Sequence, residues 1–243
     1  MRTRTSSVVL LAALSLALSG GCKSSKDKDR AAKEGKQAGD QVGALDAMLS
    51  LGTKSKLGIE IRTSRGSWRP LSVGDRLGTG VELRARKGTR ARLGLSDGSR
   101  LLLNQNTRIK IAGLRRLEVA SGELLAQVEP GKDRQPLLIQ TPAGQVKVTG
   151  TKLNLRVDDK RTVVDVTRGS VEVKGSGGAV QVGAGERAEV APGSRPRVSV
   201  SRDLVRVTGW SRELETSARS EKQAFQEGFG SLTARVPGAG KSR

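Results

Sequence analysis

The stretch RARLGLSDGSRLLL, residues 90–103, indicates how this chain folds. Apolar side chains fall on every second residue on both sides of Asp97-Gly98, at Leu93, Leu95, Leu101 and Leu103. Alternation with a period of two is typical of a strand that has one buried and one exposed face. Because Asp-Gly between two such runs is a strong hairpin signal, the stretch predicts two antiparallel strands joined by a two-residue connection.

The same alternation recurs across residues 57–200, in segments such as TRIKI, GELLAQV, GQVKV and KLNLRV, and turn-forming glycines separate these segments. A dozen or more short strands without intervening helices indicate an antiparallel all-β domain. A sandwich, a jelly roll and a β-roll of stacked hairpins all agree with this pattern.

The composition limits both the core and the chemistry. Aromatic residues are 2% of the chain and tyrosine is absent, so the core must consist of Val, Leu, Ile and Ala. Histidine is absent and there is one cysteine, which excludes an internal disulfide and histidine-dependent nucleophilic catalysis. We expect no enzyme activity, no metal site and no cofactor. The acidic pair Asp158-Asp159 is expected in a solvated turn, because neighbouring strand residues point to opposite faces.

The phase of the alternation changes at Gly150. In QVKVTGTKLNLRV, residues 145–157, the apolar positions are even-numbered before Thr149-Gly150-Thr151 and odd-numbered after it. A strand that keeps its apolar side inward must absorb one extra residue there, which predicts a β-bulge or a strand break at Gly150. A glycine turn between two separate strands is the alternative. In either case the backbone conformation explains why residue 150 is a glycine.

The first 22 residues have the layout of an export signal that ends at a lipidated cysteine. Positively charged residues precede an apolar run, residues 8–18, and small residues lead into Cys22. The run is too short for a comfortable membrane-spanning helix. Its end resembles a bacterial lipobox, although Ser19 occupies the position where such boxes prefer Leu. We expect a signal peptide at residues 1–21 and a covalent lipid on Cys22; an ordinary signal peptide with an unmodified cysteine is the alternative.

Polar segments flank the expected β domain. Residues 22–56 are rich in Lys, Asp, Ser and Gly and are expected to be a solvated tether. Apolar residues at helical spacing predict a short helix at residues 40–51, and glycines there leave a continuous tether as the alternative. Residues 201–243 are expected to form a C-terminal helix and tail. Lys23 replaces the Asp that retains lipoproteins at the inner membrane, so we expect the outer membrane, facing the periplasm.

The chain is strongly basic, with a formal net charge of +20. Alternation along strands predicts a basic stripe that includes Arg84, Arg86, Arg90 and Arg92. Outside the cytoplasm such a stripe would suit lipid headgroups, lipopolysaccharide or an acidic polymer, whereas general surface charge is the alternative. Nucleic acid is not expected, because the chain carries an export signal and few aromatic residues for base stacking.

Several turn motifs together resemble the FecR domain over residues 57–195. The motifs occur in the family's order: Gly74-Asp75, Asp97-Gly98-Ser99, Thr141-Pro142 and Gly150-Thr151. They resemble positions that determine the fold and carry no obvious chemistry. The best-understood members combine a cytoplasmic sigma-factor-binding segment, a membrane helix, a periplasmic FecR domain and a domain that contacts an outer-membrane transporter. This sequence departs from that plan, because we expect a lipid anchor in place of the cytoplasmic segment and the membrane helix. The resemblance therefore implies the β domain and not the regulator's transfer of a signal.

These observations predict a lipid-anchored, non-enzymatic envelope protein that presents a FecR-type β domain for protein or ligand binding. Its expected partners are the membrane, through the anchor, and another envelope protein. An accessory of an envelope signalling system is one alternative, and a module that binds polyanions or glycans is another. The sequence does not identify a small-molecule ligand.

Overall fold

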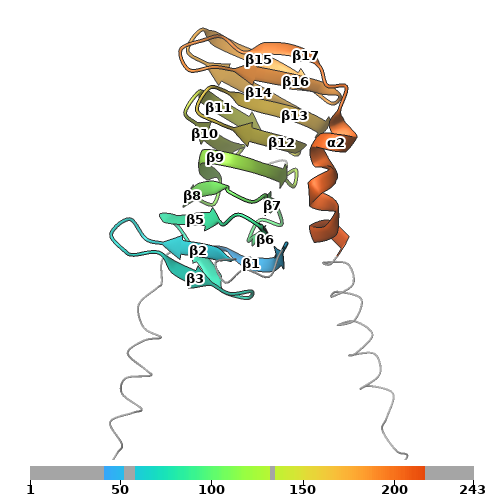
Figure 1. Cartoon of the computed structure of the whole chain (residues 1–243). Helices are drawn as coiled ribbons and strands as arrows, with labels where there is room; N and C mark the ends of the chain where they lie inside the picture. Colours follow the sequence, from blue (N-terminus) through green and yellow to red (C-terminus); the bar gives the residue numbers. More distant parts are fainter. Residues whose placement is uncertain (1–40, 52–57, 132–134, 217–243) are drawn as a thin grey trace, which may run out of the picture. The chain divides into compact units, whose positions relative to one another are not determined.

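The computed structural model describes residues 41–51, 58–131 and 135–216, and these residues belong to one compact unit. Seventeen strands and a short helical segment make up this described part of the chain. Figure 1 shows the strands stacked one above another, with helix α2 alongside the stack. The predicted all-β fold with a short C-terminal helix is confirmed.

The first layer of the stack, sheet A, contains the strand that begins the described part of the chain. Its hydrogen-bonded order is β4 (Arg76–Gly78), β1 (Gln41–Ser50), β6 (Thr89–Leu95), β7 (Arg100–Leu103), β9 (Arg116–Gln127), β12 (Lys152–Val157), β13 (Thr162–Arg168), β16 (Glu186–Val190) and β17 (Arg197–Val200). Strand β17 therefore lies at one edge of this sheet.

The second layer, sheet B, lies face to face with sheet A. Its order is β3 (Arg69–Leu71), β2 (Ile59–Arg62), β5 (Val81–Ala85), β8 (Arg108–Gly113), β9, β10 (Leu137–Thr141), β11 (Gly144–Val148), β14 (Ser170–Gly175) and β15 (Gly178–Gly183). Among the described strands, β9 and β10 form the single parallel pair.

Strand β9 belongs to both sheets. Its first half pairs with β8 and β10 in sheet B, and its second half pairs with β7 and β12 in sheet A. The change comes at Gly122, where φ is +100° and a Cβ atom would lie 2.4 Å from the Cα of Thr107. Glycine is required at this bend, because other residues rarely adopt positive φ and have no room for a side chain there.

Successive hairpins alternate between the sheets, with β12–β13 in sheet A, β14–β15 in sheet B and β16–β17 in sheet A. Of the three arrangements that the sequence allows, this is the roll of stacked hairpins. The change of phase at Gly150 is explained by the step from β11 in sheet B to β12 in sheet A. It is a strand break, and Gly150 adopts a φ of +70°.

The main core fills the space between the two sheets and consists of Val, Leu, Ile and Ala, as the composition requires. Inward residues such as Leu83, Leu93, Ile109 and Leu155 are completely buried. Residues between them in sequence point to the outer faces of the sheets, because strand side chains alternate. The roll therefore has two outer faces, which other molecules can contact.

The predicted helix at residues 40–51 is wrong, and with it the domain boundary at residue 57. Residues 41–50 form β1, which pairs with β4 and β6. The register shifts before Gly43 and again between Leu45 and Ala47, and each bulge adds one residue to the strand. The first bulge lets Val42 and Leu45 both join the main core although they are three residues apart. After the second bulge, Leu49 packs in a separate cluster with Leu102 and Leu125. The helix-like spacing therefore combines residues from two faces of a strand, which explains the error.

Gly43 also favours the strand at this point. A Cβ atom on Gly43 would lie 2.2 Å from the carbonyl oxygen of Gly94 on β6. This glycine lets the two backbones approach closely, so it is a pairing residue and not the interruption of a helix. The expected signal peptide, Cys22 and most of the expected tether lie outside the described residues.

The hairpin at Asp97-Gly98 has a three-residue loop, not the two-residue connection that was predicted. The Gly98 N–H donates to the Leu95 carbonyl oxygen at 3.0 Å, and the Leu95 N–H donates to the Ser99 carbonyl oxygen at 2.8 Å. With φ at +87°, Gly98 completes a type I turn followed by a glycine bulge. The Asp97 carboxylate stabilises the loop by accepting from the Ser99 N–H at 2.8 Å.

The C-terminal helical segment begins at Leu204, near the start of the range 201–243 that is expected to form a helix and tail. Helix α2 (Leu204–Thr208) leads into a 3-10 turn, η1 (Gly209–Ser211), and helical turns continue to residue 216. Ser211 lies inside the segment, where its hydroxyl donates to the Thr208 carbonyl oxygen at 2.8 Å. The remainder of the expected helix and the tail lie outside the described residues.

Candidate functional site

The outer face of sheet A is covered by the C-terminal helical segment. Leu214, which is 1% exposed, packs against Ala47, Leu102 and Leu125. Leu102 and Leu125 point away from the main core and still have no exposed surface. The helical segment therefore forms a second, smaller core on this side of the roll, where Figure 1 shows α2 running alongside the strands.

Polar contacts fix the same segment to sheet A. Arg92 on β6 is buried, and its Nη1 donates to the carbonyl oxygen of Leu214 at 2.9 Å. The Nε atom of Arg92 lies 3.6 Å from an oxygen of Asp46. Further along the sheet, the Lys152 ammonium group lies 3.1 Å from the carboxylate of Glu215. Because a charged group is rarely buried without a partner, Arg92 is here a structural residue.

A buried polar network connects β13, β16 and the start of the helical segment. One oxygen of the Asp165 carboxylate, which is fully buried, accepts from Arg187 Nε at 2.7 Å and from the Ser201 hydroxyl at 2.6 Å. This contact raises the pKa of the Arg187 guanidinium. The network fixes the chain after β17, where it turns back over sheet A. It is therefore part of the cover.

The predicted basic stripe is wrong as a single surface. Arg84 and Arg86 lie on or beside β5 of sheet B and share the carboxylate of Glu60. Arg90 and Arg92 lie on β6 of sheet A and contact the C-terminal helical segment. Because the chain passes from sheet B to sheet A between β5 and β6, residues close in sequence point to opposite sides of the roll.

The outer face of sheet B has no such cover among the described residues. A row of alternating charges crosses its neighbouring strands, namely Arg62, Glu82, Lys110 and Glu118. Arg62 Nη2 lies 2.7 Å from a Glu82 oxygen, and Lys110 Nζ lies 3.1 Å from a Glu118 oxygen. Cross-strand pairs of opposite charge stabilise a sheet modestly, so this row on the outer face also helps to hold the strands together.

A cluster of arginines around Trp68 lies at one end of this face, and we call Trp68, Arg62, Arg84 and Arg108 the Trp68 cluster. The guanidinium carbons of Arg84, Arg62 and Arg108 lie 4.2, 4.6 and 5.7 Å from the centre of the Trp68 ring. Such distances allow cation–π attraction. Tryptophan and arginine are also the residue types that most often dominate protein–protein binding energy.

Glu60 neutralises part of this cluster. Hydrogen bonds from Arg86 and then from Arg84 lower the pKa of its carboxyl group from 4.5 to about 2. Both arginines are therefore bonded to an ionised carboxylate in the folded state. Arg62 is bonded to Glu82 in the same way.

Arg108 differs from the other arginines of the cluster. Its side chain is exposed, and no carboxylate of the described residues forms an ion pair with it. It lies at the rim of a surface depression of about 440 Å³, which we call the slot. Its lining includes Arg108, Lys110, Glu118, Ala120 and Pro142.

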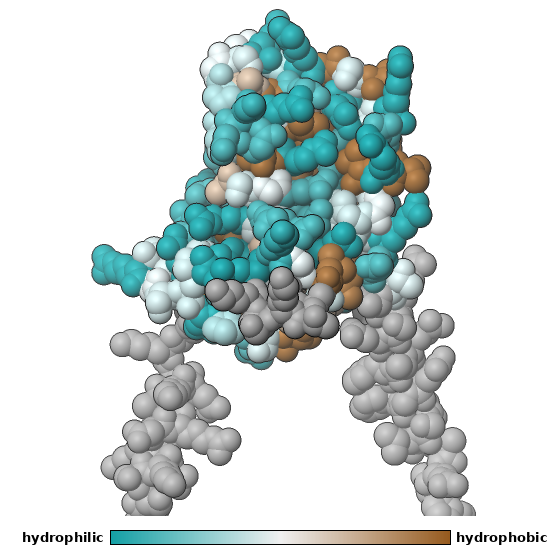
Figure 2. Space-filling model, viewed as in Figure 1, coloured by the Kyte–Doolittle hydropathy of each residue, from teal (hydrophilic) through white to brown (hydrophobic). Residues whose placement is uncertain are grey.

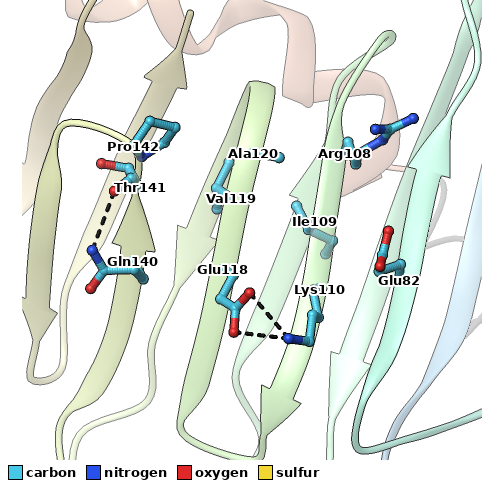
Figure 3. Close-up of a pocket in the computed structure, with 10 residues that line it drawn as sticks. All are labelled: Glu82, Arg108, Ile109, Lys110, Glu118, Val119, Ala120, Gln140, Thr141 and Pro142. Carbon is cyan, nitrogen blue, oxygen red and sulfur yellow. Dashed lines mark hydrogen bonds and ion pairs between the residues drawn. The ribbon is translucent and has the colours of Figure 1, made fainter. Parts of the chain in front are cut away.

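The slot exists because a small residue lies between larger ones. Figure 3 shows Ala120 on β9 between Arg108 on β8 and Pro142 beyond β10, with the Lys110–Glu118 ion pair along the same strands. Since β8 and β10 flank β9, the walls lie two strand spacings apart, or about 10 Å. The slot offers an apolar floor, one apolar wall and one guanidinium wall. It can hold a side chain or a similarly small group.

Hydropathy agrees with a polar outer surface. The face in Figure 2 is mostly hydrophilic, with separate small apolar groups. Exposed large apolar side chains of the described residues include Val200 on the edge strand β17 and Val205 on α2, at 73% and 70% exposure. A polar surface with charged and aromatic groups is typical of a non-obligate protein interface.

The predicted turn residues lie at connections between strands. Gly74 has a φ of +91°, and its N–H donates to the Leu45 carbonyl oxygen at 2.8 Å, while the Asp75 carboxylate accepts from the Ser72 N–H at 2.9 Å. This turn therefore holds β1 against the roll. No sequence signal linked the Gly74-Asp75 turn to residues 41–50.

Thr141-Pro142 and Gly150-Thr151 lie at two further connections. Thr141 and Gly144 close the β10–β11 turn, where the Thr141 hydroxyl donates to the Gly144 carbonyl oxygen at 3.0 Å. The Thr151 hydroxyl donates to the Ser170 carbonyl oxygen at 2.8 Å. Pro142 additionally lines the slot, which the sequence did not indicate.

The acidic pair lies in the turn between β12 and β13. Asp158 Oδ1 accepts from the backbone N–H groups of Lys160 and Arg161 at 2.8 and 2.9 Å. The first of these hydrogen bonds is the main reason why the pKa of Asp158 is lowered. Its carboxylate stabilises the turn. Within the described ranges, no three Cys, Asp or Glu side chains lie close enough together to hold a metal ion.

The comparison with known protein families gives a specific match. Residues 81–172 match the family described as FecR protein. This segment of the chain is therefore similar to the FecR domain. The match runs from the start of β5 into β14, so it includes Arg108, Ala120 and Pro142. It excludes Trp68 and the C-terminal helical segment, and it is shorter than the resemblance over residues 57–195.

Solved structures and curated proteins add little to the FecR match. Two crystal structures of a proposed anti-sigma factor from Parabacteroides distasonis, at 1.65 and 2.50 Å resolution, are 24% identical to this chain, with TM-scores of 0.48 and 0.47. Each alignment covers 53% of this chain and 63% of the other, so the chain spans less than two thirds of those proteins. No curated protein matches. No helix of the described residues is long and apolar enough to cross a membrane.

Proposed function

We propose that this protein is a non-enzymatic binding module of the bacterial cell envelope, attached to a membrane by lipid on Cys22. We further propose that the FecR domain binds a protein partner through the outer face of sheet B. The observation that carries the proposal is the difference between the two outer faces. The chain's own helical segment covers sheet A, whereas the Trp68 cluster and the slot lie open on sheet B.

The charge pattern of sheet B favours a protein over a uniform polyanion. Glu60, Glu82 and Glu118 alternate with the cations of this face and would repel a continuous acidic polymer. All four arginines of the predicted stripe form ion pairs with carboxylates, and Arg92 is also buried. A partner with alternating charges of its own would match this face better, and such complementarity favours specificity.

The anchor is proposed from the sequence around Cys22, and labelled palmitate tests it. Cells that express the full chain should incorporate the label into the protein, and the Cys22→Ser variant should not. Separation of the inner and outer membranes should place the labelled protein in the outer membrane, as Lys23 predicts. Label that persists in Cys22→Ser, or protein found in the cytosol, would exclude the anchor.

A photo-crosslinking amino acid tests the binding face in intact cells. Placed at Lys147 on the outer face of sheet B, it should give one discrete crosslinked adduct with a partner protein. An excess of the same protein without the crosslinker should reduce the amount of this adduct. The matched position is Arg156 on β12, on the outer face of sheet A. If the adduct forms equally at both positions, the assignment of sheet B is wrong.

An accessory role in envelope signalling is the second candidate, because the FecR domain match favours it. In that case the crosslinked partner would be a transporter or a membrane-bound regulator, and loss of this protein would change expression of a sigma-factor-dependent gene. Recovery of structural envelope proteins alone, with unchanged expression, would exclude this role.

A further inference from the structure

We propose that the slot receives a carboxylate-bearing side chain of the protein partner, and that the guanidinium of Arg108 donates hydrogen bonds to this carboxylate. This rests on the proposed function, because it assigns the chemistry of the same face. The argument begins with the arginines of the Trp68 cluster, which are not equivalent. Arg62 and Arg84 are already bonded to Glu82 and Glu60, whereas Arg108 forms no ion pair with a carboxylate of the described residues.

Burial of this face makes the difference between the arginines important. A partner that covers the Trp68 cluster removes water from Arg108, and a buried guanidinium without an anionic acceptor is strongly unfavourable. Arg62 and Arg84 bring their own acceptors and do not impose this requirement. The partner must therefore supply an acceptor to Arg108, and a carboxylate matches a guanidinium fork with two parallel hydrogen bonds.

The shape of the slot selects a side chain and not an extended polymer. Its floor is Ala120, its far wall is Pro142, and the Lys110–Glu118 ion pair limits it along the strands. A short aliphatic stem against Ala120 and Pro142, with its carboxylate directed to Arg108, describes Asp or Glu. The Glu118 carboxylate at the end of the slot would repel a second negative charge next to the first.

The test is a titration of the purified full chain with a five-residue peptide that carries one glutamate between alanines and has blocked ends, with the same peptide carrying glutamine as the uncharged counterpart. Two-dimensional NMR should show the Arg108 side-chain Nε–H signal and the Trp68 indole N–H signal moving with the glutamate peptide. The Trp210 indole is an internal control, because it packs against the covered face of sheet A. The glutamine peptide should leave all three signals unchanged.

Two variants with matched controls separate the site from general charge. Arg108→Gln should weaken binding about tenfold, the value of one hydrogen-bonded charged group, whereas Arg116→Gln makes the same change of charge elsewhere on the face and should weaken it less than about twofold. Ala120→Leu should fill the slot and weaken binding severalfold. Ala179→Leu, at an exposed alanine on β15, should have no effect.

Equal weakening in Arg108→Gln and Arg116→Gln would overturn the proposal, since the attraction would then be nonspecific. Unimpaired binding in Ala120→Leu, confirmed as folded by its melting temperature, would overturn the role of the slot. Dextran sulfate is the competing ligand class, and dependence on Arg108 for dextran sulfate alone would assign the slot to polyanions. The titration does not depend on cell location, so its failure leaves the palmitate and crosslinking results standing.

Discussion

The two outer faces of the roll carry similar residue types and use them in opposite ways. Each face has one tryptophan with an arginine near its ring, Trp210 with Arg90 and Trp68 with Arg84. On sheet A these groups lie under or within the C-terminal helical segment, together with buried leucines. On sheet B the same chemistry is open and leads to the slot.

This difference shows that a cover decides what a charged side chain does. An arginine under the helical segment loses water and is stabilised by the groups that enclose it, as Arg92 is by the Leu214 carbonyl oxygen. Arg108 on the open face is exposed and forms no ion pair with a carboxylate of the described residues, so it remains available for another molecule. Substitutions on sheet A should therefore change stability, and substitutions on sheet B should change binding.

The largest effect is expected where the cover is apolar. Leu214→Ala removes a side chain that is 1% exposed and packs on Leu102 and Leu125, so unfolding should require about 2–4 kcal/mol less free energy. Val205→Ala, on the same helical segment at 70% exposure, should change it by less than about 0.5 kcal/mol. Urea unfolding followed by circular dichroism measures both. A neutral Leu214→Ala would mean that the segment does not pack on sheet A in solution.

A smaller effect is expected from one arginine on each face. Arg92→Ala should cost about 2 kcal/mol, because its side chain is buried and bonded to the helical segment. Arg84→Ala should cost less than about 1 kcal/mol, because its partly exposed side chain leaves Glu60 still bonded to Arg86. The same urea experiment compares the two variants. Equal losses would contradict the division into a covered and an open face.

The smallest effect concerns pH and the open face. The pKa of Glu60 is lowered to about 2 by Arg86 and Arg84. Because the folded-state pKa is below the unfolded-state value, the carboxylate stabilises the fold above about pH 4.5, and this stabilisation is lost as pH falls toward 2.

Glu60→Gln should therefore reduce stability by about 1–2 kcal/mol at pH 7, with the gap to the wild type shrinking as pH falls from 5 to 2. Urea midpoints across that range measure the gap. Glu118→Gln, which breaks a more exposed pair with Lys110, should give a smaller gap at pH 7. If the stability difference between Glu60→Gln and the wild type stays constant with pH, ionisation of Glu60 is not the cause of the pH dependence.

Much of the fold could be predicted because it depends on local patterns. Alternation at residues such as Leu93 and Leu95 identifies strands without knowledge of their partners. Gly98 and Gly150 have positive φ, which glycine alone adopts easily, so they mark connections in the sequence. The same repeated turns carry the resemblance that the FecR match over residues 81–172 bears out.

The errors arose where partners far apart in sequence decide the structure. Residues 41–50 have helical apolar spacing, but β4 and β6 were available as strand partners, and two bulges adapted the spacing to them. Arg84 and Arg92 were placed on one stripe because only their strand periodicity was visible. The crossing from sheet B to sheet A between β5 and β6 separates them, and no local signal reports which sheet a strand joins.

The sequence by itself determined the β class, the aliphatic core and the turn positions, because each follows from side-chain periodicity or from the conformational freedom of glycine. Only the tertiary structure decided which outer face is covered, that Arg92 is buried, and that Arg108, Ala120 and Pro142 form a slot. The physical reason is that burial and the pairing of charges depend on distances across strands. Those distances are set by the stacking of hairpins and the return of the C-terminal segment over sheet A.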